Sequence, residues 1–182
     1  LLGSACFNGD VFDTARTRSK DILKRVISFY DYIEVQPPEN YLYLINTGGV
    51  DSFETIKKYI KDIIEAADEL GKMVVATGDV HYLNPEDKIF RDVFIAAKGV
   101  GGRPHPLFVN NVKAEAPNQH YRNTKEMLDA FEFLGKEKAF EIVVTNTNKI
   151  ADMIDSMKPI QKELHPPVIE DSPKILKEVT ES

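Results

Sequence analysis

The stretch from residue 52 to residue 77 constrains the fold more than any other part of the sequence. Apolar residues recur along it at helical spacing and form one stripe: Phe53, Ile56, Ile60, Ile63, Ile64, Ala67 and Leu70. Asp51 or Ser52 can cap the start of this helix, and Gly71 suits the position after its end. The apolar segment MVVAT follows at once. A helix, a glycine and a buried strand in this order are typical of an α/β barrel or layered sheet, in which chemistry collects at the carboxyl ends of the strands.

The residues directly after this strand, ATGDVHY, are polar. Asp79 and His81 lie two positions apart, and residues at this spacing in an extended chain project to the same side. Their carboxylate and imidazole can therefore converge on one metal ion or one phosphate. The alternative is ordinary turn chemistry at Gly78-Asp79 beside a partly exposed histidine. Both interpretations stay open on these residues alone.

The same α/β pattern extends to both sides of this stretch. The predicted upstream elements are the end of a strand at 1–6, a helix from about Asp13 to Tyr30, a strand at 30–36 that Pro37 and Pro38 end, and a loop at 39–50. The first predicted downstream element is a helix that begins at Asn84 and Pro85, ends at Gly99 and buries Ile89, Phe90, Val93 and Phe94. An irregular connection at 99–122 follows, around a short strand. The remaining elements are a helix from Asn123 to Leu134 with Glu126 in its capping box, a helix from Lys136 to about Met157 broken at TNTN, and a proline-rich linker from Pro159.

The bulk composition excludes several classes of protein. A net charge of −6 argues against a large sequence-independent DNA-binding surface. No apolar run approaches the roughly 18 residues that a membrane span needs. The single cysteine, Cys6, cannot form an internal disulfide, so we expect a cytoplasmic protein.

Other residues have less certain chemistry. Cys6 is either a soft metal ligand or a small buried side chain, and Glu34 is either paired near a metal or exposed on an edge strand. We expect His105, His120 and His165 to be exposed loop residues. The glycine-rich run at 98–103 follows a helix, whereas a phosphate-binding loop joins a strand to a helix, so it is not a nucleotide site.

Several long segments together resemble one family. They are GSACFNGDVFD at 3–13, DYIEVQP at 31–37, VVATGDVHYLNPEDKIFRDV at 74–93, HYRNTKEMLDAFEFLG at 120–135 and KAFEIVVTNTNKIADMI at 138–154. These segments resemble the PHP (polymerase and histidinol phosphatase) domain of the PolC-type bacterial DNA polymerase III large subunit. The resemblance implies part of a distorted seven-stranded β/α barrel, similar to a TIM barrel, followed by a helical segment and a proline-rich linker. Residues 1–157 would be the carboxyl-terminal portion of the PHP domain with its helical connection, and 158–182 the linker or the start of the palm domain.

The resemblance also implies a metal site. Asp79 and His81 match the family's final Asp-x-His motif, Cys6 matches a ligand position, and Glu34 is a possible neighbour of the site. The implied metals are zinc or manganese in the intact PHP domain and magnesium in the parent polymerase. The family's opening His-x-His motif is absent from this sequence, and in this subfamily a proofreading exonuclease interrupts the barrel before the point where this chain would begin.

These implications lead to one main hypothesis and two alternatives. In the main hypothesis the chain is a fragment of a replicative DNA polymerase, a scaffold with a partial metal site that is inert alone. Its expected partners are the rest of the polymerase chain (the amino-terminal PHP half, exonuclease and palm) and, through it, DNA and replisome proteins. Unpaired strand edges would favour self-association or pairing with an absent segment. The alternatives are a free-standing metal-dependent phosphoesterase of the PHP superfamily and a degenerate site whose residues only form hydrogen bonds.

Overall fold

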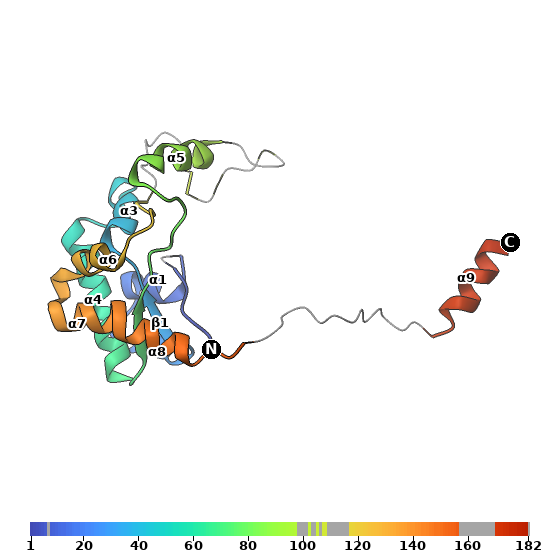
Figure 1. Cartoon of the computed structure of the whole chain (residues 1–182), viewed down its shortest axis with the longest axis horizontal. Coiled ribbons are helices and arrows are strands. Elements are labelled where there is room, and N and C mark those ends of the chain that lie inside the picture. The colour runs from blue at the N-terminus through green and yellow to red at the C-terminus, as the bar shows by residue number, and fades with distance from the viewer. Residues whose placement is uncertain are drawn as a thin grey trace.

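The computed structural model describes residues 1–6, 8–97, 102, 105, 107–108, 117–156 and 170–181. Figure 1 shows the arrangement of their elements. The strands are β1 (Tyr32–Val35) and β2 (Met73–Ala76), and the helices are α1 (Asp10–Thr17), α2 (Lys20–Ser28), α3 (Leu42–Asn46), α4 (Phe53–Glu69), α5 (Lys88–Ala96), α6 (Thr124–Ala130), α7 (Lys136–Phe140), α8 (Asn146–Asp152) and α9 (Ser172–Glu181). No helix in these ranges is both long and apolar enough to cross a bilayer.

The two strands pair in parallel, and α4 is the crossover between them. Ile33 lies opposite Val74, and Val35 lies opposite Ala76. The first residues of the chain continue the pattern, because Gly3 forms a parallel bridge with Tyr32. A side chain at position 3 would meet the Tyr32 ring, since a Cβ there would lie 2.4 Å from a ring carbon. The strands predicted at 30–36 and 73–76 are thus confirmed, whereas the strand end predicted at 1–6 is a single bridge at Gly3.

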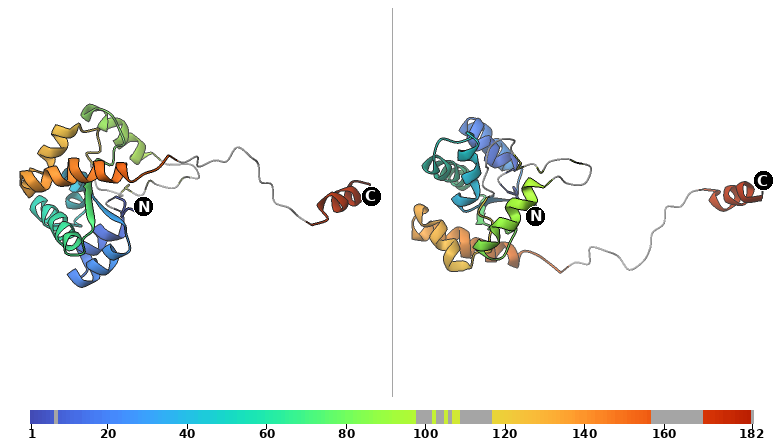
Figure 2. Two further views of the ribbon diagram at one scale, coloured as in Figure 1. Left: turned by 60° about the horizontal axis from the view of Figure 1, so that its bottom comes forward. Right: turned by 90° about the horizontal axis from the view of Figure 1, so that it is seen from above.

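One face of the strands joins the main apolar core. Ile33, Val35, Val74 and Ala76 belong to the same cluster of buried residues as the apolar stripe of α4. Figure 2 shows α4 and the helix formed by α7 and α8 next to β2, with α1 and α2 next to α4. The opposite face carries Tyr32, Glu34 and Met73, which are half-buried. The predicted alternation of β1 is therefore confirmed.

The helix α4 is the best match between sequence and structure. The Ser52 side chain accepts a hydrogen bond from the Thr55 N–H at 3.2 Å, which makes Ser52 and not Asp51 the cap. Gly71 has a φ of +65°, the left-handed conformation that favours glycine after a helix. The capping box at Asn123 and Glu126 is also present, with both reciprocal hydrogen bonds formed.

The single helix predicted from Asp13 to Tyr30 is wrong. The chain forms α1 and α2, because Arg18 adopts an extended conformation with φ −129° and ψ 173°. Each short helix turns its own apolar residues inward, Phe12 on α1 and Leu23 and Ile27 on α2. Both helices pack against α4, which one straight helix could not do with the same residues.

The loop predicted at 39–50 is also wrong in part. Residues Pro38–Tyr41 form a 3₁₀ helix that leads directly into α3. Tyr41 is buried and its ring stacks on that of Phe12, with centroids 4.2 Å apart. The aromatic contact holds the segment against α1, and this long-range contact has no periodic signal in the sequence.

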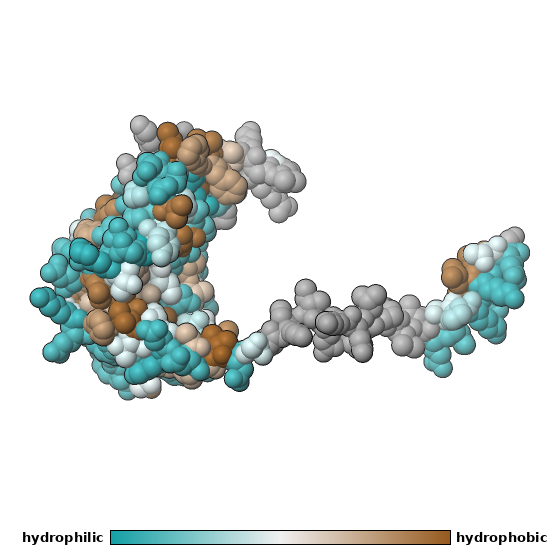
Figure 3. Space-filling view, viewed as in Figure 1, coloured by the Kyte–Doolittle hydropathy of each residue, from teal (hydrophilic) through white to brown (hydrophobic). Residues whose placement is uncertain are grey.

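The apolar face of α5 is not buried, contrary to the prediction. The four residues expected in the core are 60–71% exposed: Ile89, Phe90, Val93 and Phe94. Ile95 is buried instead. Figure 3 shows hydrophobic atoms gathered over this helix. The helical period was correctly recognised, but the periodic stripe has no partner among the described residues to cover it.

The polar TNTN run does not break the last long helix. Residues 136–152 are helical throughout, with a π-helical segment at Glu141–Thr145 just before Asn146. Asn146 is only 4% exposed, and its Nδ2 donates to the backbone carbonyl of Val74 at 2.9 Å. The Asn146 side chain therefore supplies a hydrogen-bond donor to a β2 carbonyl that pairs with no strand among the described residues. Further along the chain, α9 was not predicted and lies within residues 158–182, which were expected to be a linker or the start of the palm domain. The predictions for Gly99, His165 and residues 158–169 lie outside the described residues.

Replacement of Asn146 by alanine should destabilise the chain by about 1–3 kcal/mol, because the buried Val74 carbonyl loses its donor. Urea unfolding would measure this change. The matched control is Asn148→Ala, since Asn148 is exposed and donates only to Val144 of its own helix. Equal effects of the two substitutions would contradict a special role for Asn146 at the strand edge.

An exposed ion-pair cluster should make the packing of α2 on α4 sensitive to acid. Hydrogen bonds from Lys20 and Lys24 lower the pKa of Glu69 to about 2, from an ordinary 4.5. Because the folded pKa is depressed, the stabilising effect is complete above pH 4.5 and is lost as the pH falls toward 2. The difference in unfolding free energy between the parent and Glu69→Gln should shrink over that range, and about 1 M salt should reduce it at pH 6. A difference that stays constant with pH would refute this assignment.

Candidate metal centre at the carboxyl ends of the strands

The carboxyl ends of the three parallel segments meet at one edge. Ser4 and Cys6 follow the first segment, Gln36 follows β1, and Thr77 follows β2. The Thr77 N–H donates to the Val35 carbonyl at 3.0 Å, so the pairing extends one residue past β2. This geometry brings the polar residues that follow each strand into one neighbourhood.

Asp79 and His81 lie close together, as predicted, but not through the extended backbone on which the prediction rested. The Nε2 of His81 lies 3.5 Å from Oδ1 of Asp79, and their side chains are 39% and 21% exposed respectively. Asp79 has a φ of +47°, a left-handed conformation that aspartate adopts more readily than most residues. This backbone turn directs the carboxylate toward the imidazole and leaves both groups accessible to a cation from solvent.

Residues 117–122, which we call the clamp segment, run beside the Asp79–His81 turn. The His81 N–H donates to the Gln119 carbonyl at 2.8 Å, and Tyr82 forms a parallel bridge with His120. The Gln119 side chain then donates from Nε2 to Oδ2 of Asp79 at 2.6 Å. The clamp segment thus extends the parallel pairing beyond β2 and holds the carboxylate directly.

The hydroxyl of Tyr82 closes the clamp segment from the other side. It donates to the Pro117 carbonyl at 3.2 Å and accepts from the Gln119 N–H at 3.0 Å. Pro117 and Gln119 are both buried. The Gln119 N–H also donates directly to the Pro117 carbonyl at 2.9 Å, so the phenol gives each of these two backbone groups a second partner.

A second set of bonds ties the turn to the 3₁₀ helix at 38–41. Asn40, which is fully buried, donates from Nδ2 to the Gly78 carbonyl at 3.0 Å. Arg122 in turn donates to Oδ1 of Asn40 at 3.4 Å and to the Asn118 carbonyl at 2.8 Å. Burial lowers the pKa of Arg122, against the opposing effect of Glu39. The network fixes the backbone just before Asp79.

Glu34 lies at the same edge and is hydrogen-bonded. Its Oε2 accepts from the Thr77 hydroxyl at 3.0 Å, and its backbone N–H donates to the Ser4 hydroxyl at 2.9 Å. Its half-buried side chain is therefore bonded to Thr77, the residue directly after β2, and its role as a site neighbour stays a prediction.

Cys6 is half-buried and packs against the main core. Burial raises the pKa of the Tyr41 phenol, and the nearby Cys6 and Asp79 raise it further. Cys6 follows the first parallel segment and Asp79 follows β2, so both residues come after the carboxyl ends of parallel segments.

These residues do not by themselves form a complete metal centre. Within the described ranges, no three side chains of histidine, cysteine, aspartate or glutamate lie close enough together to hold a metal ion. The structure thus joins Asp79 to His81 but does not bring Cys6 to the pair. The donor types nevertheless fit zinc, whose usual ligands are thiolate, imidazole and carboxylate. The carboxylate of Asp79 also suits manganese, which prefers oxygen ligands to a thiolate. The three-residue ligand set stays a prediction.

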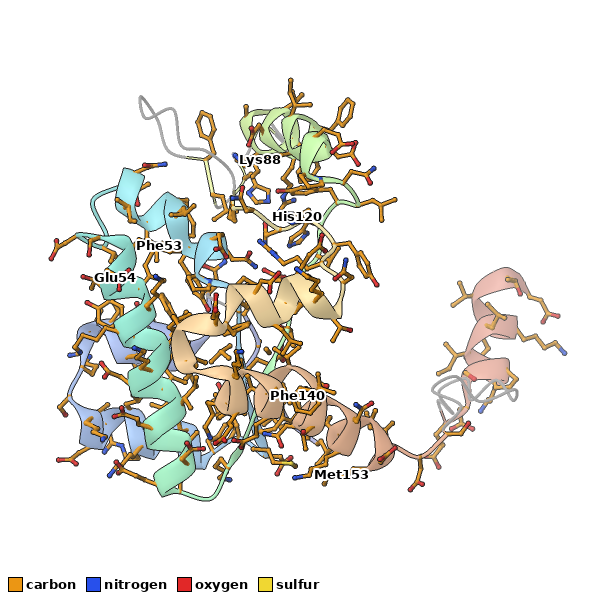
Figure 4. The ribbon with its side chains drawn as sticks, turned by 60° about the vertical axis from the view of Figure 1, so that its left-hand side comes forward. Phe53, Glu54, Lys88, His120, Phe140 and Met153 are labelled. Carbon is orange, nitrogen blue, oxygen red and sulfur yellow. The ribbon has the colours of Figure 1, made fainter. Side chains whose placement is uncertain are left out.

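The expectation of exposed histidines is wrong for His105 and His120, which are half-buried. Burial lowers the pKa of both imidazoles. Figure 4 shows His120 between α5 and α6, with Lys88 at the start of α5. Nδ1 of His105 accepts from the Leu107 N–H at 3.1 Å, and its ring meets that of Phe94 edge-on.

Sequence reasoning missed the residues that hold the turn, namely Gln119, Asn40 and Arg122. Their roles depend on contacts across 40 and 38 positions for Gln119 and Asn40, and no spacing rule connects such positions. The one available signal was the position of Gln119 directly before the capped helix α6, where the chain re-enters the core.

Comparison with known proteins shows which class of protein this chain is similar to, the bacterial DNA polymerases. The chain is 46% identical over 180 residues to the DNA polymerase III PolC-type of Bacillus subtilis, 44% over 180 residues to that of Halalkalibacterium halodurans and 43% over 183 residues to that of Streptococcus thermophilus. In each case the match covers 99% of this chain but only 12% of the polymerase. No family model matches the chain. The chain is therefore similar, over 99% of its length, to one segment of DNA polymerase III PolC-type, and it spans only a small part of these relatives.

The hydrogen bond between Gln119 and Asp79 should be visible in stability. Asp79→Asn keeps an acceptor and tolerates the left-handed backbone, so we expect a loss within about 1 kcal/mol. Asp79→Ala leaves the buried Gln119 amide without its acceptor and should cost about 1–3 kcal/mol more. Urea unfolding of the two variants measures the difference. Equal stabilities would show that the bond contributes little.

Proposed function

We propose that this chain is a segment of the PHP domain of a replicative DNA polymerase and serves as a scaffold for the polymerase that contains it. The observation that carries the proposal is the match of nearly the whole chain, at 46% identity, to one stretch of a PolC-type enzyme. The parent activity would be template-directed DNA synthesis, with a 3′–5′ exonuclease elsewhere in the parent chain.

The parallel strands and their helical cover support the architecture in this proposal. Three parallel segments with helices against one face are what part of a seven-stranded β/α barrel would contain. In this proposal residues 1–157 belong to the PHP domain and its helical connection, and residues 158–182 lead toward the palm.

The metal site of the proposal is partial. Asp79 and His81 would supply two ligands and Cys6 a third, with Glu34 beside them. A bound zinc or manganese ion would supply a Lewis acid or an activated water. The residues of this chain would orient the ion, and Thr77 and Gln119 would hold the carboxylates of Glu34 and Asp79 in place. Magnesium would belong to the polymerase site of the parent chain.

The remaining partners follow from the small share of the relatives that the chain covers. The rest of the polymerase chain, including the other PHP half, exonuclease and palm, would supply the missing ligands and strand partners. DNA and replisome proteins would be partners through the parent, in the cytoplasm. The exposed apolar face of α5 supports contact with further protein, in the parent chain or in a second copy.

Assays on two proteins should distinguish this proposal from a free-standing phosphoesterase. The 182-residue chain should neither extend a primer nor hydrolyse p-nitrophenyl phosphate with Mn²⁺, because the part of it that the structure describes brings too few metal ligands together. The same chain extended at both ends to the length of its relatives should extend a primer. Manganese-dependent hydrolysis by the short chain, lost in Asp79→Asn, would favour the phosphoesterase, and an extended chain without primer extension would contradict the polymerase assignment.

A further inference from the structure

We propose that Gln119 is a positioning residue for the metal site, and that it leaves only one oxygen of Asp79 for the metal ion. This inference rests on the proposed metal site at Asp79 and His81. It assigns a role to the clamp segment, which carries no predicted ligand.

The side chain of Gln119 has one partner. It is fully buried, and its Nε2 donates to Oδ2 of Asp79 at 2.6 Å. Its Oε1 is buried and has no hydrogen-bond partner among the described residues. Burying an amide oxygen without a hydrogen bond costs free energy, so the hydrogen bond that the amide nitrogen makes must compensate for that cost. The bond to Asp79 is the interaction that explains a glutamine at this place.

The backbone of Gln119 is held so that this side chain cannot move away. Its carbonyl accepts from the His81 N–H at 2.8 Å, and its N–H donates to the Tyr82 hydroxyl at 3.0 Å. The same residue therefore contacts the turn at Asp79, His81 and Tyr82. Any shift of the clamp segment would displace the carboxylate and the imidazole together.

The two oxygens of Asp79 consequently have different surroundings. Oδ2 is occupied by the amide of Gln119, while Oδ1 faces Nε2 of His81 at 3.5 Å. A cation approaching the pair meets Oδ1 and the imidazole. Asp79 would therefore bind through one oxygen, with Gln119 holding the other, which is the usual role of a group that orients a metal ligand from behind.

The test uses the full-length polymerase that contains this segment, with Zn²⁺ and Co²⁺ as probes. Gln119→Met removes the donor at similar volume, and Gln119→Glu keeps the shape but replaces the amide donor with a carboxylate. Both variants should bind Zn²⁺ at least about tenfold more weakly in chelator competition. Co²⁺ bound at this site should give a visible absorption that is lost in Asp79→Asn. Both Gln119 variants should alter that absorption, since it reports the geometry of the ligands.

The matched control is Gln36→Met. Gln36 is also a buried glutamine at the carboxyl edge with an unpartnered Oε1. Zn²⁺ affinity should change less than about twofold in this variant. Circular dichroism identifies any variant that does not fold, and either folded Gln119 variant is sufficient for the test.

The possible failures are distinguishable. Unchanged metal affinity in a folded Gln119 variant, with loss in Asp79→Asn and His81→Gln, would overturn the role of Gln119 and leave the metal site intact. Equal losses in the Gln119 and Gln36 variants would show a general packing effect and would also overturn it. If Asp79→Asn and His81→Gln bind as much metal as the parent, the metal site fails and the inference fails with it.

Discussion

The parallel pairing of β1 with β2 is the constraint on which the rest of the structure depends. It requires a long crossover, which α4 supplies, and it turns Ile33, Val35, Val74 and Ala76 to the same face. It also brings the carboxyl ends of both strands to one edge, so the polar residues after β1 and β2 become neighbours. The core and the candidate site are thus two consequences of one register.

At that edge several hydrogen bonds hold one short turn in place. Hydrogen bonds from Asn40, Gln119 and Tyr82 converge on residues 78–82 and their partner segment. The described residues provide this positioning but not a full set of metal ligands. If the proposed metal site exists, this part of the chain would supply its supporting framework and a minority of its ligands, which agrees with a chain that spans 12% of its relatives.

Local signals in the sequence predicted local structure well. The stripe and caps of α4, the capping box of Asn123 and the alternation of β1 all depend on neighbouring positions, and all are confirmed. The closeness of Asp79 and His81 was predicted too, but from an extended backbone, whereas the structure has a left-handed turn at Asp79. Features that depend on distant contacts were not predictable. The break at Arg18, the stacking of Tyr41 on Phe12 and the role of Gln119 each require knowledge of what packs against them. The prediction that the apolar face of α5 is buried was wrong, because periodicity identifies an apolar face but not what covers it.

The left-handed backbone at Asp79 has a consequence for how such a site changes over evolutionary time. At a φ of +47° most side chains are strained, whereas glycine, asparagine and aspartate are tolerated. A lineage that loses the need for a negative charge at this position is therefore confined to very few substitutes, and asparagine alone among them retains both the turn and an oxygen for the clamp segment. Loss of function at this site would then be seen as a change of one functional group at this position, while the surrounding structure stays the same.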